Sequence, residues 1–348
     1  MLKSLHLKNF TVFPDADLEF GKNLNVIIGE NGLGKTHILK AAYCAQAVSA
    51  RGFKETGSGN PTKAHLQSAV ATKLRGVFRP DELGRLARRQ AGRSRAEVAC
   101  HFDEKKLDLA FSLNSTSKSE VVMEATPSAW CSEVPIYLPT REMLTIYPGF
   151  VSLYETAHIP FEETWRDLAI LLGAPLAKGA REKKVRQLLE PLEGVMGGQI
   201  VLDGEKFYLK SKAGEIEMHL VAEGMRKLAM LARLIATGSL LDKGTLYWDE
   251  PEANLNPKLV KLVARTILEV SAQGIQVFVA SHSLFLMREL FILQQTEFKQ
   301  LEARCFGLHD RGEGVTVEQG ATMDDVGEIA ALDEDLLQSE RYMDLPSA

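Results

Sequence analysis

Alternating apolar and polar residues open the chain. Residues 2–20, LKSLHLKNFTVFPDADLEF, put an apolar side chain at almost every second position, which is typical of two strands with one buried face. Residues 23–28, NLNVII, follow as a short apolar run that predicts a central strand buried on both faces. Residues 37–48 then space their apolar side chains as a helix does. We therefore expect strands, a buried strand and a helix, in that order.

Both patterns recur farther along the chain. Strand patterns appear at residues 98–115, 120–126, 198–221, 246–248 and 275–280. Within 198–221 an Asp-Gly and an Ala-Gly pair predict two turns. Helix patterns cover residues 160–195 and 221–238. Strand and helix patterns thus recur along much of the chain.

Composition narrows the class of protein. The 348 residues are 45% apolar and 25% charged, enough to bury a large core in one big domain or two lobes. The four cysteines are scattered without metal-type spacing, and no leader or long apolar run appears. We expect a reduced, cytoplasmic protein without a membrane span. The net charge of -5 argues against a surface that is basic all over.

A glycine-rich loop stands between the buried strand and the first helix. Residues 29–36, GENGLGKT, follow the pattern G-x-x-x-x-G-K-[ST] in the strand–loop–helix context that a phosphate loop requires. Its glycines allow backbone N–H groups to face phosphates, and the helix N-terminus favours an anion. Lys35 would reach the β and γ phosphates, and the Thr36 hydroxyl would bind Mg²⁺.

Two adjacent acids follow a second buried strand. Asp249 ends the apolar segment 246–248, and Glu250 comes next, directly before Pro251. A phosphate loop needs an acid at a neighbouring strand end to hold the metal, and Asp249 fits this role. Glu250 would face another direction and could activate a water molecule. The alternative is a solvated acidic turn.

Three segments together resemble the ABC-type ATPase heads of the SMC, RecF and OLD families, which contain AAA domains of the AAA_21 and AAA_15 type. These segments are GENGLGKT, LYWDEPEANLNP and VFVASHSLFLMREL. The third places His282 at the end of the predicted strand 275–280. The resemblance covers residues 1 to about 45 and about 215 to 290.

This resemblance implies a fold, a cofactor and a set of roles. The fold would be an α/β P-loop NTPase of ABC type, with a mixed β lobe and a RecA-like parallel sheet flanked by helices, and the cofactors ATP and Mg²⁺. Asp249 and Thr36 would hold the metal. Glu250 would be the catalytic base, His282 the sensor of the γ phosphate, and Lys35 the third catalytic residue. The implied nucleotide contacts are Gly29, Glu30, Asn31, Gly32, Leu33, Gly34, Lys35, Thr36, His37, Gly224 and Arg226.

The predicted helix at 221–238 begins where such heads carry their signature segment. In the resembling families a serine and backbone N–H groups there bind the nucleotide of the opposite subunit. Ala222 stands in place of that serine. The D-loop would be residues 253–257, in which Asn256 replaces the usual aspartate. Arg226 and Lys227 could supply positive charge to the partner's nucleotide instead. Alternatively, they are solvated residues of the first helical turn.

The segment between the phosphate loop and the signature is short and rich in proline, so we expect no coiled-coil arms. We expect one discontinuous ATPase domain over residues 1–348. Its parts are lobe I at about 1–135 with a basic insert at 50–97, a linker and helical region at about 136–195, lobe II at about 196–310, and an acidic tail at 311–348. Arg141 or Glu142, where ABC heads have a glutamine loop, would have to lie near the metal.

The basic insert starts with residues 50–72, which we expect to begin as a polar, flexible loop. Basic residues then gather at Lys73, Arg75, Arg79, Arg85, Arg88, Arg89, Arg93 and Arg95. This cluster could bind double-stranded DNA through its phosphates, dock on an acidic surface, or be a solvated helix face.

A head without arms implies a separate effector protein. Our favoured hypothesis is an ATP-dependent homo-oligomeric switch in bacterial anti-phage defence that controls a partner such as a Toprim-type nuclease. The ATPase of the phage anti-restriction-induced system is similar in motif style. One alternative is a RecF-like, ATP-dependent DNA-binding repair protein. A second is a nucleotide-gated scaffold that hydrolyses little ATP, which Ala222 and Asn256 would permit.

Overall fold

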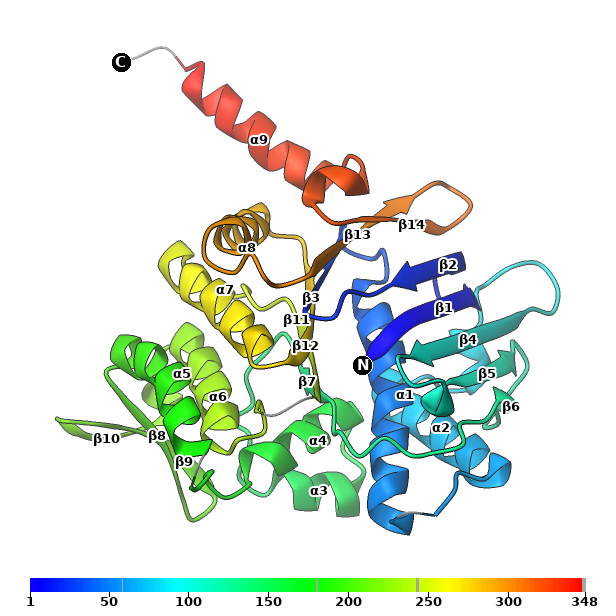
Figure 1. The fold of residues 1–348 in the computed structure, drawn as a ribbon, viewed down its shortest axis with the longest axis horizontal. Coiled ribbons are helices and arrows are strands. Elements are labelled where there is room, and N and C mark those ends of the chain that lie inside the picture. The colour runs from blue at the N-terminus through cyan, green and yellow to red at the C-terminus, as the bar shows by residue number, and fades with distance from the viewer. Residues whose placement is uncertain (58, 180, 242–243, 346–348) are drawn as a thin grey trace.

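A six-stranded sheet forms the centre of the fold (Figure 1). The computed structural model describes residues 1–57, 59–179, 181–241 and 244–345. The strands of this sheet run in the order β14-β13-β3-β12-β11-β7, and only β14 is antiparallel to its neighbour. They are β3 (Leu24–Ile28), β7 (Ile136–Leu138), β11 (Gly244–Asp249), β12 (Ile275–Ser281), β13 (Ala303–Asp310) and β14 (Val315–Gly320).

Both faces of this sheet are covered, which explains the continuous apolar runs in its strands. Every residue of β11 and β12 is buried. Successive side chains alternate between two cores: Phe278 and Ala280 belong to one, and Val277 and Val279 belong to the other. A parallel sheet buried on both sides produces this pattern.

The first core lies between the central sheet and an antiparallel sheet of order β2-β1-β4-β5-β6. Its strands are β1 (Leu2–Phe10), β2 (Phe13–Glu19), β4 (Arg95–Phe102), β5 (Leu109–Asn114) and β6 (Val122–Ala125). Two helices pack into this layer, α1 (Lys35–Thr56) and α2 (Lys63–Phe78). The predicted strand pair at the start of the chain and the strands at 98–115 and 120–126 are confirmed.

The second core lies on the other face of the central sheet. Its helices are α3 (Phe150–Ala157), α4 (Glu163–Leu172), α5 (Arg181–Met196), α6 (Glu223–Ala236), α7 (Pro257–Ala272) and α8 (Leu284–Thr296). A small antiparallel sheet joins them, made of β8 (Gly198–Asp203), β9 (Lys206–Ser211) and β10 (Gly214–Glu217). The predicted glycine turns separate its strands, with Gly204 at φ 58° and Gly214 at φ 128°.

The prediction of a flexible loop at the start of the insert is wrong. Helix α1 continues to Thr56, and α2 begins at Lys63. Gly52 lies inside α1 because the helix passes very close to Trp130, where a Cβ on Gly52 would come within 2.5 Å of the indole ring. Glycine here allows close packing and does not end the helix.

A buried ion network joins α2 to α4 and corrects the assignment of one basic residue. The Nζ atom of Lys73 lies 3.0 Å from Glu163 Oε1 and 2.5 Å from Asp167 Oδ2. The Tyr43 hydroxyl of α1 also donates to Asp167. Burial alone would lower the pKa of Lys73, but the two carboxylates outweigh it and raise the pKa. Lys73 is therefore internal and unavailable to a phosphate backbone.

The predicted acidic tail contains regular structure. Residues 315–320 form β14, which pairs with β13 at the edge of the central sheet. Helix α9 (Ala330–Met343) follows and extends away from the body of the molecule (Figure 1). The side chains of Asp333 and Asp335 lie outside the described residues. The helix exposes Leu337 and Tyr342.

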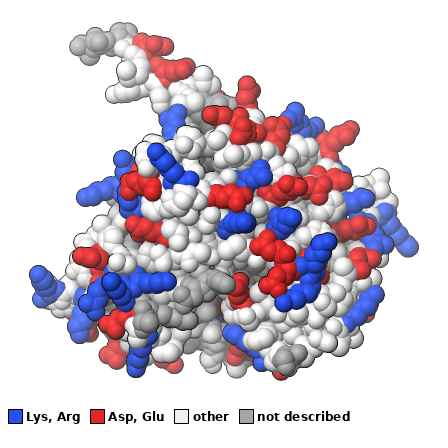
Figure 2. All heavy atoms as spheres, in the orientation of Figure 1, with Lys and Arg blue, Asp and Glu red and all other residues white. Residues whose placement is uncertain are grey.

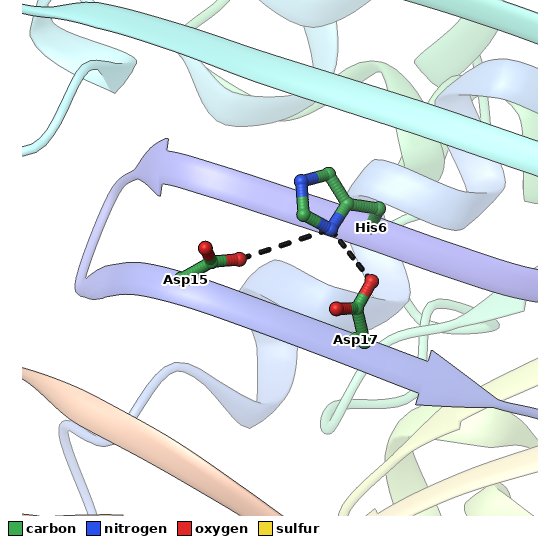
Figure 3. Close-up of side chains that lie close together, drawn as sticks. All are labelled: His6, Asp15 and Asp17. Atoms are coloured by element: carbon green, nitrogen blue, oxygen red, sulfur yellow. Dashed lines mark hydrogen bonds and ion pairs between the residues drawn. The ribbon is translucent and has the colours of Figure 1, made fainter.

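One exposed cluster lies on the antiparallel sheet (Figure 3). The Nδ1 atom of His6 on β1 is 2.6 Å from Asp17 Oδ1 and 3.8 Å from Asp15 Oδ1 on β2. His6 and Asp17 are directly opposite in the register of the two strands. The contact is thus a cross-strand pair on a solvated face.

Candidate nucleotide-binding site

The glycine-rich loop connects the end of β3 to the start of α1. Gly32 and Gly34 both have a φ of 89°, which favours glycine at each position. A Cβ on Gly34 would also lie 2.6 Å from Val12 Cγ2. Glycine is therefore required at position 34 both by its positive φ and by this close packing. The turn between β1 and β2 therefore packs directly against the base of α1. The loop is held in a compact curve by this contact.

Lys35 folds back onto the loop that precedes it. Its Nζ atom donates to the carbonyl oxygens of Gly29, at 2.7 Å, and Glu30, at 2.8 Å. The side chain is buried, and this burial lowers the pKa of Lys35 although nearby carboxylates act in the opposite direction. Lys35 is thus an ammonium group held by carbonyl dipoles, without a closely bonded anion.

Thr36 and Asp249 meet across the gap between α1 and β11. The Thr36 hydroxyl donates to Asp249 Oδ2 at 2.8 Å, and the Tyr137 hydroxyl lies 3.4 Å from the same oxygen. Burial raises the pKa of Asp249, and the hydrogen bond from Thr36 partly offsets this. A hydroxyl and a carboxylate are the hard oxygen donors that Mg²⁺ takes, so these residues fit that ion. Sequence reasoning missed Tyr137, which carries no motif.

Glu250 and His282 come together at the ends of β11 and β12. The Nδ1 atom of His282 is 3.3 Å from Glu250 Oε1, and both side chains are partly exposed. Glu250 has a φ of 47°, and its N–H donates to the Ala280 carbonyl. This unusual backbone turns the Glu250 side chain away from the line of the strand. A water molecule can reach the carboxylate from solvent.

The other loop residues differ in their surroundings. In the loop, Glu30, Asn31 and Gly32 are exposed. Leu33 is partly buried. His37 packs 5.8 Å from the Phe78 ring, and burial lowers its pKa to about 4. Its Nδ1 has no hydrogen-bond partner among the described residues. His37 can therefore face a nucleotide through its backbone N–H, with a neutral ring packed inside.

The signature segment is engaged within its own chain. Ala222 is the N-cap of α6 and makes no side-chain capping bond. Gly224 approaches the D-loop so closely that a Cβ would lie 3.0 Å from the Asn254 carbonyl oxygen. The Nε atom of Arg226 is 3.0 Å from Glu142 Oε1. Arg226 thus already has an ionic partner.

Among the described residues, no hydrogen bond or ion pair joins Glu142 to Thr36 or Asp249. Its carboxylate accepts the N–H groups of Leu144 and Thr145 as well as pairing with Arg226. Glu142 is thereby a link between the segment after β7 and the first turn of α6. The substitution of Asn256 in the D-loop also has a local effect, because its side chain caps α7 by accepting the N–H of Leu259 at 3.0 Å.

Two further charged residues lie beside the site, and the structure corrects one prediction. Lys227, predicted as a charge for a partner's nucleotide or a solvated residue, is 3% exposed and donates to the Glu250 carbonyl at 2.6 Å. Burial lowers the pKa of Lys227 to about 8. Glu252, which sequence reasoning missed, accepts a hydrogen bond from Ser281 at 2.6 Å, and burial raises its pKa. The repeated acid in DEPE was the available signal for Glu252.

The remaining basic cluster divides between two places. Arg75 of α2 and Arg79, its C-cap, line an open groove of about 920 Å³, together with Arg51, Arg166 and the acidic residues Asp81, Glu155 and Glu163. The other members lie toward β4: Arg85, Arg89, Arg93 and Arg95 are exposed, and Arg88 is partly buried. On the face in Figure 2, basic and acidic side chains are interspersed among the described residues. The groove is therefore lined by side chains of both charges.

Comparison with known proteins relates this chain to two AAA-domain families and to SMC head structures. Residues 133–288 match AAA_21, an AAA-domain family whose description connects it with the AbiEii toxin of type IV toxin–antitoxin systems, and residues 4–58 match AAA_23, a second AAA-domain family. The structure superimposes on a crystal structure of an Smc head bound to the C-winged helix domain of ScpA. That match has a TM-score of 0.57 and 16% identity, and it covers 93% of this chain and 98% of the other.

The fold is that of an SMC/RecF-like ABC ATPase head. The SMC head domain from Thermotoga maritima matches as well, with a TM-score of 0.50 and 15% identity over 91% of this chain and 97% of that one. The predicted fold class is thereby confirmed. The longest helix in the described ranges is α1, with 22 residues, so this part of the head contains no coiled-coil arm.

Sequence relatives match over short segments. The DNA replication and repair protein RecF of Acetivibrio thermocellus is 39% identical over 74 residues, which are 19% of this chain and 20% of RecF. RecF of Pediococcus pentosaceus is 48% identical over 42 residues, 12% of this chain and 11% of that protein. The chain thus covers about a fifth of these relatives at most. In the described residues of this chain, we find no helix with the length and apolar character needed to cross a membrane.

Proposed function

We propose that this chain binds ATP with Mg²⁺ at residues 29–36 and hydrolyses it. The observation that carries the proposal is the 2.8 Å contact between Thr36 of the loop and Asp249 of β11, with Glu250 on the adjoining turn. It brings a phosphate-binding loop, a hard-cation donor set and a candidate base to one end of the sheet. Clefts at the carboxyl ends of parallel strands are where α/β proteins bind ligands.

Each residue of the candidate site has a distinct role in this proposal. The loop N–H groups and the start of α1 bind the phosphates, and Lys35 exchanges its two carbonyl partners for phosphate oxygens. Bound Mg²⁺ would neutralise charge on the β and γ phosphates. The Glu250 carboxylate accepts a proton from the attacking water, and His282 orients that carboxylate and contacts the γ phosphate. Asp249 and Thr36 would hold the metal through their oxygen atoms.

ATP turnover tests the proposal directly. We expect Mg²⁺-dependent release of phosphate from ATP by the wild-type protein. Glu250→Gln should lower kcat by about 10²- to 10⁴-fold with ATP affinity retained, because only the proton acceptor is lost. Glu190→Gln, an exposed acid on α5, is the matched control and should leave kcat unchanged. Equal turnover in Glu250→Gln and wild type would show that Glu250 is not the base.

We further propose that ATP closes two copies of the chain into an oligomer. The nucleotide on the loop of one copy would be covered by Gly224 and Arg226 of the other. For Arg226 to contribute, it has to leave Glu142. Light scattering of Glu250→Gln with and without ATP tests this, and an unchanged mass with ATP would contradict it.

The favoured biological role is control of a separate effector, in particular a nuclease, in bacterial anti-phage defence. The support is the match to AAA_21, a family connected with a toxin–antitoxin system, together with the absence of arms in the described part of the chain. We expect a nuclease to co-purify with Glu250→Gln from its own host in one nucleotide state. Purification without nuclease activity, with and without ATP, would contradict this role.

A second candidate is an ATP-dependent DNA-binding repair protein, favoured by the RecF matches and by the groove that Arg75 and Arg79 line. Phosphate binding by these residues predicts duplex affinity that falls steeply with salt. Arg75→Glu with Arg79→Glu should abolish it, while Arg89→Glu with Arg93→Glu should not. The reverse result would move the DNA surface to the β4 side of the cluster. If wild type binds ATP and oligomerises without turnover, the third candidate, a nucleotide-gated scaffold, is favoured.

A further inference from the structure

The turn that carries Glu250 has a strained backbone. Glu250 and Asn254 both have positive φ values, 47° and 64°. Neither is glycine, so each conformation costs free energy that surrounding contacts must offset. Inside the turn the Ala253 N–H donates to the Glu250 carbonyl at 3.1 Å. With the bond from the Leu255 N–H to the Glu252 carbonyl, the turn has two internal bonds and otherwise depends on neighbouring elements, including β12.

Lys227 of α6 adds a contact to this turn from another element. Its Nζ atom donates to the Glu250 carbonyl at 2.6 Å and lies 3.3 Å from the Ala253 carbonyl. Within the described residues, the structure assigns Lys227 no ion pair, although its side chain is almost completely buried. An ammonium group held only by carbonyls is costly to bury. The cost of burying the Lys227 ammonium group points to a role for the carbonyl contacts that it makes.

Helix α6 and the turn are joined at two more points. The Asn254 side chain donates to Glu223 Oε1 at 2.9 Å. Gly224 lies against the Asn254 carbonyl, where a Cβ would come within 3.0 Å. The first turn of α6 and residues 250–254 are therefore joined at three points, and Lys227 is the contact at the Glu250 end.

We propose that Lys227 is a positioning residue that ties the location of Glu250 to the location of α6. This inference rests on the proposed function, in which the start of α6 faces the nucleotide of a second copy. When that nucleotide draws α6 inward, Lys227 carries the Glu250 backbone with it. Each copy thereby sets its own catalytic base in response to ATP on its partner. A misplacement of about 1 Å at a reacting group can cost about 10²-fold in rate.

Lys227→Met tests this link because methionine keeps the aliphatic stem and removes the donors. We expect kcat for ATP to fall about 10²-fold while the Kd for ATP changes less than about threefold, since no phosphate contact is lost. Propylammonium added to Lys227→Ala should restore part of kcat by occupying the vacated ammonium position. Lys299→Met, which removes an exposed lysine, is the control and should match wild type.

Hydrogen exchange gives a readout that does not require turnover. We expect the amides of residues 250–254 to exchange faster in Lys227→Met than in wild type, with α7 and β12 unchanged. Unchanged exchange in this turn, or a kcat within about threefold of wild type, overturns the inference. A wild-type protein without turnover would refute the proposed function, whereas the exchange experiment would still decide whether Lys227 holds the turn.

Discussion

Two buried polar regions of this molecule contrast in how their charges are matched. Around Lys73, the ammonium group meets two carboxylates, which raise the pKa of Lys73 despite its burial, and the pKa of Asp167 is lowered. Around the candidate site, burial lowers the pKa of Lys35 and Lys227 and raises that of Asp249. Charged forms are stabilised in the first region and disfavoured in the second. The first region holds the fold together, while the second is suited to receiving a charged ligand.

The largest effect on stability is expected from breaking the ion network around Lys73. Lys73→Met should lower the free energy of unfolding by about 3 to 5 kcal/mol, because it leaves Asp167 and Glu163 buried without their cation. Urea denaturation measures this, and Lys54→Met, an exposed substitution on α1, is the control. Adding Asp167→Asn and Glu163→Gln to Lys73→Met should recover part of the loss.

The same region sets an acid limit. Burial raises the pKa of Asp167, but Lys73 and the Tyr43 hydrogen bond outweigh it and lower the pKa below its ordinary value of 3.8. The stability from Asp167 is therefore present above pH 3.8 and is lost as pH falls through the lower folded pKa. Lys73→Met should remove this part of the acid sensitivity. An unchanged slope of stability against pH below 4 would contradict this account of the network.

The corresponding substitution in the candidate site should affect ligand binding more than stability. Lys35→Met removes an ammonium group that is disfavoured by burial, so the free energy of unfolding should stay within about 1 kcal/mol of wild type. ATP binding should weaken by about 2 to 5 kcal/mol, because a charged partner of the phosphates is lost. Denaturation and equilibrium binding measure the two effects. A large loss of stability with intact ATP binding would reverse the contrast.

Ligand binding should stabilise the buried charged groups of the candidate site and thereby the folded protein. At a concentration 100 times the Kd, ATP with Mg²⁺ should stabilise the native protein by about 2.7 kcal/mol. Asp249→Asn should weaken this stabilisation when Mg²⁺ is present and change it little when Mg²⁺ is absent. Equal stabilisation of wild type and Asp249→Asn with Mg²⁺ would argue against Asp249 as a metal ligand. Thermal unfolding with each nucleotide and metal combination is the measurement.

The smallest effect concerns the altered D-loop. Asn256→Ala should cost about 1 kcal/mol of stability because it removes the N-cap of α7. Asn256→Asp keeps a capping oxygen and should leave stability near that of wild type. If Asn256→Ala is as stable as Asn256→Asp, the capping bond contributes nothing measurable.

The sequence predicted those parts of the molecule whose signal is local. The phosphate loop, its flanking strand and helix, and the acids after β11 each depend on a few neighbouring residues, and the fold class followed from them. Gly52 was misleading because its cause is Trp130, far away in the sequence. Lys73 was grouped with exposed arginines because Asp167 is 94 residues away. Lys227 was placed at the surface for the same reason, since its carbonyl partners belong to another element.

The position of β3 in the central sheet has a consequence for synthesis of the chain. β3 lies between β12 and β13, so its residues pair with Val277–Ser281 and Ala303–Gly307. Translation proceeds at about 5 to 20 residues per second, so the first of these partners appears on the order of tens of seconds after β3 itself. Until then the loop at residues 29–34 lacks the neighbouring strands that hold it in place. A nascent chain that stalls before residue 275 cannot assemble this candidate site, however complete its antiparallel sheet is.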